Sequence, residues 1–300
     1  MVDNSPVLPV ASFCAGVGML DIGFGCAVPI AEPILYVERE IASARIMESR
    51  MQDLSLARAP VWSDLTTFDG RPWSGRVFGF TAGLPCQPYS NAGKRIGNND
   101  DRSHGKDGDG PIPHFLRIVG EVRPAMVFLE NVPAWVMGGH FRSVGEELSG
   151  LGYTIEEPMF VAAEDVGASH RRERVFILAH AKDSKWWSMA DPDGKRLQGE
   201  RDHNGTTRRQ DAAGPTRLRS GELPIYAPGP CDPRWGDIIR EAPAIEPAVR
   251  GVVAGMATRV DRLRAIGNGV SPLQAAVAAH VLLHRAGLGW LCSFDGGGLT

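Results

Sequence analysis

The chain has 300 residues, enough for one large domain or for a large and a small one. Hydrophobic residues make up 43% and charged residues 22%, which is ordinary for a globular protein, and no apolar stretch approaches the roughly 20 residues that cross a bilayer. Residues 1–5 lack the basic start of a signal peptide, so we expect a cytoplasmic protein with no membrane partner.

Short apolar runs alternate with helix-like segments through the first half of the chain. Runs typical of strands lie at residues 7–13, 34–37, 77–81 and 126–129, and a later one lies at 174–178. Helical patterns lie between them at residues 41–51 and 114–121. Strands interleaved with helices indicate an α/β domain with a mainly parallel sheet.

The pattern changes after about residue 181. The next stretch is rich in Gly, Pro, Asp and Arg, and regular apolar patterning returns near residue 243. Ser271 followed by Pro272 predicts a helix start, with the helix continuing over residues 273–284. We expect a large domain over residues 1–180, a small irregular domain over 181–242, and a return to the large domain over 243–290.

Charge and cysteine usage narrow the function classes. The net charge is only −3, but residues 195–219 are locally basic, which suits either contact with a phosphate backbone or a solvated loop. The five cysteines are scattered and none forms a C-x-x-C pair, which argues against a disulfide framework and against a structural zinc site. We therefore expect no metal.

A glycine-containing turn follows the first predicted strand, in the segment SFCAGVGMLDIGFG. Gly16 and Gly18 allow a tight turn before a helix N-terminus, which can bind an anion, although a plain strand–helix connection has the same pattern. Glu38 ends the second strand, where doubly wound folds place an acid on ribose hydroxyls, and Asp64 follows as a candidate adenine contact. The three together indicate an adenosine-containing cofactor and leave NAD and S-adenosylmethionine both open.

Three further segments carry candidate chemistry. Cys86 lies in GLPCQPYS just past a strand end. It is either a nucleophile or a small buried side chain, and both interpretations stay open. Glu130 follows four apolar residues in AMVFLENVP, so desolvation should raise its pKa and let it donate a proton, unless it only caps a turn. Arg172 and Arg174 are two residues apart at the start of a strand, so their side chains face the same side. They either hold an acceptor oxygen or belong to an exposed basic turn.

These segments in this order, GLPCQPYS, FLENVP and RRERVFIL, resemble the DNA (cytosine-5)-methyltransferases, and AIGNGVSP is similar to the last motif of that family. The likeness covers the chain to about residue 178 and again from about 243 to 284. It implies a Rossmann-like S-adenosylmethionine-dependent methyltransferase fold, with the small irregular domain as the target-recognition region. It also implies methyl transfer to C5 of a flipped-out cytosine in double-stranded DNA.

The resemblance assigns roles to individual residues. Cys86 would attack C6 of the cytosine, Glu130 would engage N3, Arg174 would bind O2 and Arg172 would support the thiolate side. Asn131 and Gln87 would organise the surroundings of these groups. The cofactor contacts would be Phe13, Cys14, Ala15, Gly16, Gly18, Met19, Glu38, Asp64 and Asn268.

The resemblance also implies how DNA is held. The polar, glycine-rich loop after Cys86 would be a lid over the flipped base. The DNA contacts would be Ser90, Lys94, Arg95, Arg196, Arg201, Arg208 and Arg209. We expect a monomer that acts on nucleoid DNA, with a cognate restriction endonuclease as a separately acting partner.

The sequence departs from the family pattern at two cofactor positions. Cys14 stands where the family usually has an aromatic residue, with Phe13 one position earlier, and Met19 replaces a second glycine. Two other functions stay open, a tRNA cytosine-5 methyltransferase and a methyltransferase-like DNA-binding subunit without turnover. The second of these usually lacks the nucleophile or the Glu-Asn pair, and both are present here.

Overall fold

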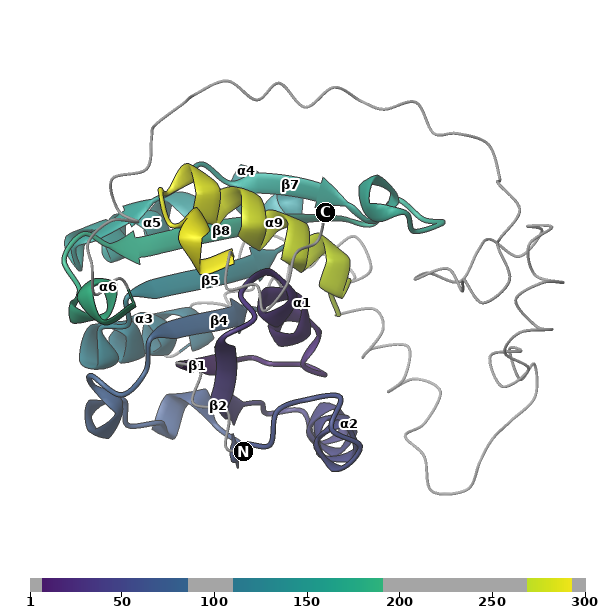
Figure 1. Ribbon diagram of the computed structural model, residues 1–300, viewed down its shortest axis with the longest axis horizontal. Coiled ribbons are helices and arrows are strands. Elements are labelled where there is room, and N and C mark those ends of the chain that lie inside the picture. Colours follow the sequence, from purple (N-terminus) through teal and green to yellow (C-terminus); the bar gives the residue numbers. More distant parts are fainter. Residues whose placement is uncertain (1–6, 86–109, 191–268, 293–300) are drawn as a thin grey trace, which may run out of the picture.

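The computed structural model describes residues 7–85, 110–190 and 269–292, and it arranges them as a layered α/β structure (Figure 1). Its strands form one sheet in the order β3-β2-β1-β4-β5-β8-β6, with β7 also pairing with β8. The strands are β1 (Leu8–Phe13), β2 (Ala31–Val37), β3 (Val61–Trp62), β4 (Gly79–Gly83), β5 (Met126–Asn131), β6 (Tyr153–Ile155), β7 (Met159–Ala162) and β8 (Glu173–Ala181).

Helices connect and cover these strands. They are α1 (Met19–Ala27), α2 (Ile41–Gln52), α3 (Pro111–Val122), α4 (Pro133–Met137), α5 (His140–Gly150), α6 (Lys185–Ala190) and α9 (Pro272–Arg285). Short 3-10 turns are η1 (Leu65–Thr67), η2 (Arg71–Trp73), η3 (Ala163–Val166) and η5 (Gly289–Cys292). Within the described ranges, none of the helices combines the length and apolarity needed to cross a membrane.

The predicted α/β architecture is confirmed, with differences at the shortest elements. Each of the five predicted strands and three predicted helices has a counterpart, and Ser271 is the N-cap of α9 with Pro272 in its first turn. Strand β4 begins at Gly79, two residues after the start predicted for the strand at residues 77–81, because its pairing with β1 begins with Val10 opposite Gly79. Strands β3, β6 and β7 were not predicted, since they have only 2, 3 and 4 residues and too few positions to show a period.

The order of the strands indicates where a ligand would bind at one edge of the sheet. Strands β1 to β5 are parallel, and after β3 the chain crosses back to place β4 on the other side of β1. Ligands of such sheets bind beyond the carboxyl ends of the strands where the order reverses. Strand β8 is antiparallel to β5, so β8 begins at the edge where β5 ends. Both segments therefore deliver residues to this carboxyl edge.

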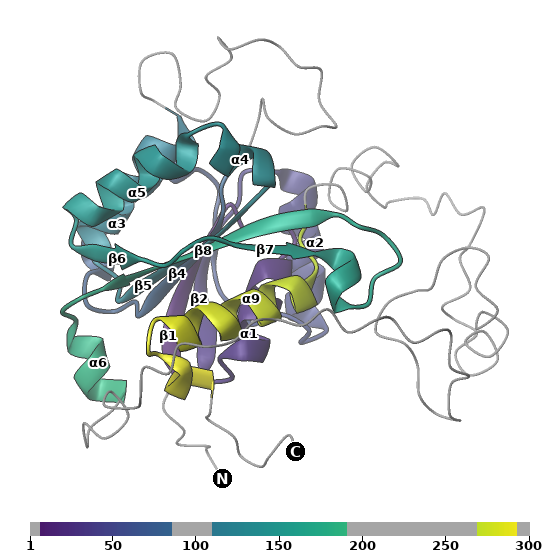
Figure 2. The ribbon, with the colours of Figure 1, turned by 90° about the horizontal axis from the view of Figure 1, so that it is seen from above.

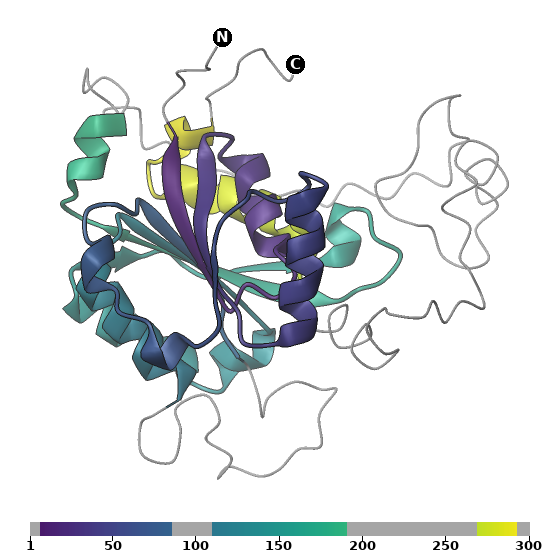
Figure 3. The same cartoon turned by 90° about the horizontal axis from the view of Figure 1, so that it is seen from below.

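Two apolar layers sandwich the sheet, with α1 and α9 on one face and α3 and α5 on the other (Figure 2 and Figure 3). Strand β5 shows why: Met126 and Phe128 belong to the first layer, whereas Val127 and Leu129 belong to the second. Alternate side chains of a strand point to opposite faces, so an almost continuous apolar strand supplies both layers.

Helix α9 packs directly on α1. A Cβ atom at Gly23 would lie 2.3 Å from the carbonyl oxygen of Pro272 and 2.6 Å from the Cβ of Ala275, so only glycine permits this approach. Gln274 of α9 is fully buried, and its amide nitrogen donates to the carbonyl oxygens of Val161 (2.7 Å) and Arg172 (2.9 Å). The start of α9 is thereby fixed to the segment that carries the two candidate arginines.

The residues after β8 remain part of the same core. Trp186 and Trp187 both pack edge-to-face against Phe78, each with ring centroids 5.9 Å apart. This part of the chain lies just beyond the domain boundary expected at residue 181. That boundary and the small domain beyond it stay predictions, because residues 191–268 lie outside the described ranges.

A buried carboxylate joins α1 to the two central strands. Asp21 accepts hydrogen bonds from the hydroxyl of Ser12 on β1 (2.8 Å) and from that of Thr81 on β4 (2.5 Å). Burial raises the pKa of Asp21 to about 6, because it disfavours the charged form more than the two hydroxyl bonds favour it. Ser12 and Thr81 lie close to the carboxyl ends of β1 and β4, so these contacts tie the two strands together next to the turn that follows β1.

Replacing Asp21 with Asn should remove a pH-dependent part of the stability. The folded state holds this proton more tightly than the unfolded state, so its contribution is complete below about pH 4 and is lost as the pH rises through about 6. A displacement of the pKa from 3.8 to about 6 corresponds to about 3 kcal/mol. The free energy of unfolding of the wild type, minus that of Asp21→Asn, should fall by about this amount from pH 4 to pH 7.

Urea denaturation at a series of pH values measures this difference. Asp183→Asn, at an exposed position, is the matched control. A wild-type-minus-Asp21→Asn difference that stays constant over the pH range would contradict the proposed burial of the charge.

Candidate active site

The turn after β1 lies at the carboxyl edge and has the shape expected of a cofactor cradle. Cys14, Gly16 and Gly18 have positive φ angles of 49°, 58° and 80°, so the chain reverses tightly before α1. The turn is closed by the amide of Gly18, which donates to the carbonyl of Ala15 (2.9 Å). A Cβ atom added at Gly16 would meet no atom of the described residues within 4 Å, so this part of the chain leaves the space over the turn open.

Glu38 lies beside the same turn and is held by two main-chain amides. Its carboxylate accepts from the amide of Gly16 (2.6 Å) and, with its other oxygen, from that of Glu40 (2.7 Å). Burial raises the pKa of Glu38 even though these bonds favour the charged form. Each oxygen accepts only one of these two bonds, so either can accept a further one from a ligand hydroxyl.

Asp64 borders the same part of the edge, just after β3. One oxygen of its carboxylate accepts from the amide (2.9 Å) and the hydroxyl (2.8 Å) of Thr66, which lowers the pKa of Asp64. Both of these bonds go to Oδ1, so Oδ2 is the atom that could face a ligand amine. Gly16, Glu38 and Asp64 thus fit an adenosine-type ligand at the ends of three neighbouring strands.

Phe13 ends β1, and the cofactor contact predicted for it would come from its main chain and not from its ring. Its ring is fully buried and packs against Phe68, Phe80 and Phe115, with centroids 4.6 to 5.8 Å apart. Phe13 points into the core because it is an inward-facing residue of β1. Cys14, the next residue, lies at the turn, and burial next to Glu38 raises the pKa of its thiol to about 12. Cys14 is therefore an uncharged, unreactive lining residue. Met19 begins α1, where its sulfur accepts from Arg50 (3.4 Å).

The second group at the carboxyl edge is a buried ion pair. Glu130, near the end of β5, contacts Arg174, near the start of β8, at 2.8 Å, and each side chain is only 11% exposed. Burial raises the pKa of Glu130 to about 7, although the charges of Arg174 and Arg172 oppose this. The apolar run before Glu130 predicts this direction, and the structure confirms it. Glu130 is therefore poised to exchange a proton near neutral pH.

Arg172 has a different setting from Arg174. Its guanidinium donates to the carbonyl oxygen of Gly269, the residue that follows Asn268 in the last motif. Burial lowers the pKa of Arg172, and the neighbouring charge of Arg174 adds to this. Arg172 therefore connects the carboxyl edge of the sheet with the C-terminal motif, a link that no local sequence pattern reveals.

Asn131 connects β5 with the segment that leads to Cys86. Its side-chain amide donates to the carbonyl oxygen of Leu84 (3.2 Å), and its own oxygen accepts from the amide of Val132 (2.9 Å). Asn131 is buried, so these bonds are shielded from water. Leu84 precedes Cys86 by two residues, so Asn131 is bonded to the segment that leads into the expected nucleophile loop.

Gly83 brings the two halves of the site into contact. It pairs with Glu130 across β4 and β5. A Cβ atom at Gly83 would lie 3.4 Å from the carbonyl oxygen of Cys14 and 3.6 Å from the Glu130 carboxylate. The cofactor turn and the ion pair are thus neighbours across a position that has no side chain.

The remaining expected site residues lie outside the described ranges. They are Cys86, Gln87, Ser90, Lys94, Arg95, Arg196, Arg201, Arg208, Arg209 and Asn268. The sequence reasoning did not find Asp21, Thr81 or Gln274, which support the edge from below. An aspartate within the apolar pattern of α1 is the one signal that could have drawn attention to Asp21.

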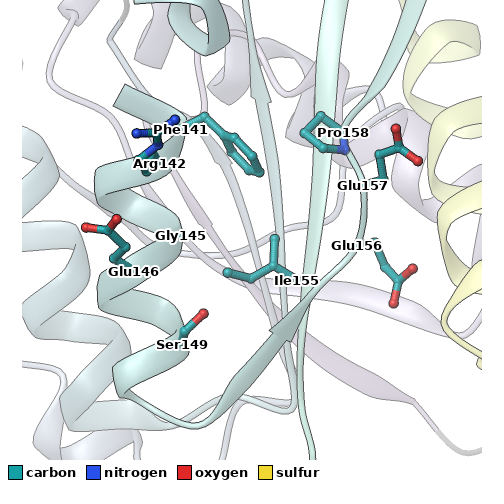
Figure 4. A pocket seen from close by; sticks show the side chains of 9 residues that line it. All are labelled: Phe141, Arg142, Gly145, Glu146, Ser149, Ile155, Glu156, Glu157 and Pro158. Atoms are coloured by element: carbon teal, nitrogen blue, oxygen red, sulfur yellow. The ribbon is translucent and has the colours of Figure 1, made fainter. Parts of the chain in front are cut away.

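A surface hollow of about 620 Å³ lies elsewhere, between α5 and the connection from β6 to β7. Figure 4 shows Phe141 and Ile155 projecting between helix and strand, whereas Glu156 and Glu157 point away from them. Of the expected site residues that the structure describes, none lines this hollow. We therefore place the candidate active site at the carboxyl edge and not here.

Comparisons with known proteins identify the family of the chain. The family model described as C-5 cytosine-specific DNA methylase matches residues 8–213, more than half of the chain. The Type II methyltransferase M.NgoMIV of Neisseria gonorrhoeae is 31% identical over 146 residues, which cover 46% of this chain and 44% of that protein. M.MthTI of Methanothermobacter thermautotrophicus is 28% identical over 180 residues, or 59% of this chain and 50% of that protein.

The match spans half or less of the length of these curated relatives. Among solved structures, the methyltransferase EhMeth of Entamoeba histolytica is 18% identical, with a TM-score of 0.47 over 60% of this chain and 55% of that one. On the extent of the family match, the chain belongs to the C-5 cytosine-specific DNA methylase family.

Proposed function

We propose that the chain transfers a methyl group from S-adenosylmethionine to C5 of a cytosine in double-stranded DNA. The observation that carries the proposal is the Glu130–Arg174 pair, buried next to a glycine turn with an adjoining acid at one edge of the sheet. The family membership supports the same reaction class. A proton-exchanging acid and a fixed guanidinium beside a cofactor cradle are the groups that this chemistry needs.

The Glu130–Arg174 pair suits the edge of a cytosine ring. O2 and N3 are neighbouring atoms of that ring, and two side chains in contact can meet two neighbouring atoms. The guanidinium of Arg174 donates to O2, and the protonated carboxyl of Glu130 donates to N3. With a pKa near 7, Glu130 carries this proton in a large fraction of molecules at neutral pH.

The residues then share the steps of the reaction. The thiolate of Cys86 adds to C6, and the electrons displaced into the ring are met by the proton that Glu130 gives to N3. C5 thereby becomes nucleophilic enough to take a methyl group. S-adenosylmethionine, when bound over the Gly16 turn, supplies that group in electrophilic form. S-adenosylhomocysteine would be left as the neutral thioether. Loss of the C5 proton to a base, return of the N3 proton to Glu130 and departure of the Cys86 sulfur as thiolate then restore the aromatic ring.

Cofactor binding would use the atoms left accessible at the first three strand ends. Glu38 would accept from ribose hydroxyls, Asp64 from the adenine amino group, and the main chain of residues 13–19 would contact the methionine end. Asn268 would close this site, next to the Gly269 carbonyl that Arg172 holds.

We propose that Ser90, Lys94 and Arg95 contact the phosphates around a flipped base, and that residues 181–242 recognise the target. Apart from residues 181–190, these segments lie outside the described ranges. The arginines of residues 181–242 would supply phosphate contacts and some base contacts. We further propose that the protein acts as a monomer in the cytoplasm, with any restriction endonuclease acting separately.

The covalent step has a direct test. Expression in cells that lack cytosine methylation, followed by bisulfite sequencing, should reveal methylated cytosines in a defined sequence context. A duplex of that sequence with 5-fluorocytosine at the target should then form a stable adduct with the protein and S-adenosylmethionine, because fluorine blocks loss of the C5 proton. Mass spectrometry should place the adduct on Cys86.

Cys86→Ser should form no adduct, while Cys26→Ser, which changes an exposed free cysteine, should form it at the wild-type rate. No adduct with the wild-type protein would overturn the mechanism. Methylation of tRNA in place of duplex DNA would keep the chemistry and replace the substrate.

The proton carried by Glu130 predicts an alkaline limb in the pH profile. Loss of this proton above about pH 7 should lower kcat/KM, because that parameter reports the free enzyme. Glu130→Gln should lower kcat/KM by about 10²- to 10⁴-fold and lack this limb, since an amide does not titrate. Glu156→Gln, at a carboxylate that pairs with His180, is the control. A Glu130→Gln variant that keeps the alkaline limb would show that another group produces it.

Asn131 predicts a positioning effect on the nucleophile. Asn131→Asp keeps the shape and the acceptor for the Val132 amide but cannot donate to Leu84. We expect adduct formation at Cys86 to slow by at least about tenfold, as for other residues that orient reactive groups, with KM for S-adenosylmethionine little changed. Stopped-time adduct assays on variant protein that passes a denaturation check measure this. A wild-type adduct rate in folded Asn131→Asp would remove Asn131 from the site.

A further inference from the structure

Two histidines and a cysteine meet at the end of the C-terminal helix, away from the candidate active site. His280 and His284 are one helical turn apart on α9, and Cys292 lies in η5, which follows it. One nitrogen of each imidazole and the Cys292 sulfur all lie within 4.8 Å of one another. Among the residues that the structure describes, this is the one group of three such side chains close enough to share a metal ion.

The spacing along α9 is the first reason to regard the three as a site. Histidines four residues apart project from the same face of a helix, and such a pair can bind one cation. The two rings are in contact, with centroids 4.5 Å apart. Within the described ranges, no carboxylate forms an ion pair with either ring, and both histidines are exposed.

Gly289 is the second reason, because it seats one of the histidines. A Cβ atom at this position would lie 2.3 Å from Nδ1 of His284 and 2.5 Å from its Cε1. Any side chain there would displace the ring, so the absence of one lets the His284 imidazole rest against η5. Cys292 lies in η5 as well, and Trp290 and Leu291 anchor η5 in the apolar core. The position of the Cys292 sulfur beside the His284 ring is therefore fixed.

We propose that His280, His284 and Cys292 bind a zinc-class divalent cation with two imidazole nitrogens and one thiolate sulfur. Tetrahedral zinc with such ligands holds the donor atoms about 3.5 Å apart, so the three groups need to close by only about 1 Å. Both histidines are exposed and can turn by this amount. As the sulfur–metal bond forms, the Cys292 thiol releases its proton to solvent and no group changes oxidation state. A water molecule takes the fourth position.

The ligand chemistry selects the class of ion. Imidazole and thiolate ligands favour zinc and its late transition-metal neighbours, whereas magnesium and calcium favour oxygen ligands. The sequence prediction of no structural zinc site relied on the absence of C-x-x-C pairs. This trio contains a single cysteine, and folding brings it to a histidine pair that the pattern of cysteines does not reveal.

The position of the trio gives the ion a structural role. The trio lies at the C-terminal end of α9, while the N-terminal end of this helix holds the main chain at Arg172 through Gln274 (Figure 1). A metal at the far end would fasten η5 to the last turn of α9. It would stabilise the helix that supports the catalytic edge without touching the reacting groups, and methyl transfer itself does not require it.

Zinc binding by the full-length protein tests the proposal. Reduced protein freed of metal with a chelator is titrated with zinc chloride in competition with a chromophoric chelator, and with cobalt chloride as an optical probe. We expect one tight site per chain, a thiolate-to-cobalt charge-transfer band, and a higher melting temperature with zinc but not with magnesium. His280→Ala, His284→Ala and Cys292→Ser should each weaken zinc binding at least about tenfold and abolish the rise in melting temperature.

Two further variants separate the site from other effects. Cys26→Ser removes an exposed cysteine outside the trio and should bind zinc like the wild type. Gly289→Ala keeps all three ligands but displaces His284, and should also weaken binding. The proposal is overturned if Cys292→Ser binds zinc as tightly as the wild type or retains the charge-transfer band. It is equally overturned if zinc does not raise the melting temperature of the wild type.

Discussion

The ion pair between Glu130 and Arg174 is the interaction on which the candidate site depends. It joins the end of a parallel strand to the start of an antiparallel one, so it exists only because β8 runs against β5. Burial and attraction act on Glu130 in opposite directions, and burial prevails, which keeps a proton available near neutral pH. If Glu130 were well solvated, the same residue would be an ordinary carboxylate with little tendency to hold a proton.

The surrounding structure maintains this pair through contacts that are themselves buried. Gln274 fixes the main chain at Arg172, Asn131 fixes the segment before Cys86, and Asp21 holds β1 against β4. A buried hydrogen bond that loses one partner costs about 1–3 kcal/mol, so these links resist small displacements at the edge. The site is therefore built from rigid strand ends, with Gly83 leaving room for its two halves to adjoin.

Much of this arrangement could be predicted from the sequence because the relevant signals are local. A carboxylate that ends an apolar run, such as Glu130, is recognisable in a single segment, and so are the Gly16 turn and the Ser271 helix start. Strands β6 and β7 gave no such signal because they are too short to show a period. The direction of the Phe13 ring, which packs into the core while Cys14 reaches the turn, also has no signal in its own segment.

Contacts between distant segments could not be predicted in this way. The bond from Arg172 to Gly269 joins residues 97 positions apart, and the amide of Gln274 reaches Val161 across 113 positions. The apolar residues around Asp21 could have indicated that it is buried, but only the fold shows that its partners are hydroxyl groups of β1 and β4. Such residues have no pattern of their own, and their roles depend on which elements the sheet order brings together.

A structure of the protein trapped on its target duplex shows directly where the buried acid and its guanidinium partner lie relative to the bound base. It should show the cytosine outside the helix stack, with a Glu130 oxygen within hydrogen-bonding distance of N3 and the Arg174 guanidinium on O2. A base that remains stacked, or one that enters with its O2 and N3 edge facing away from β5 and β8, would contradict the account.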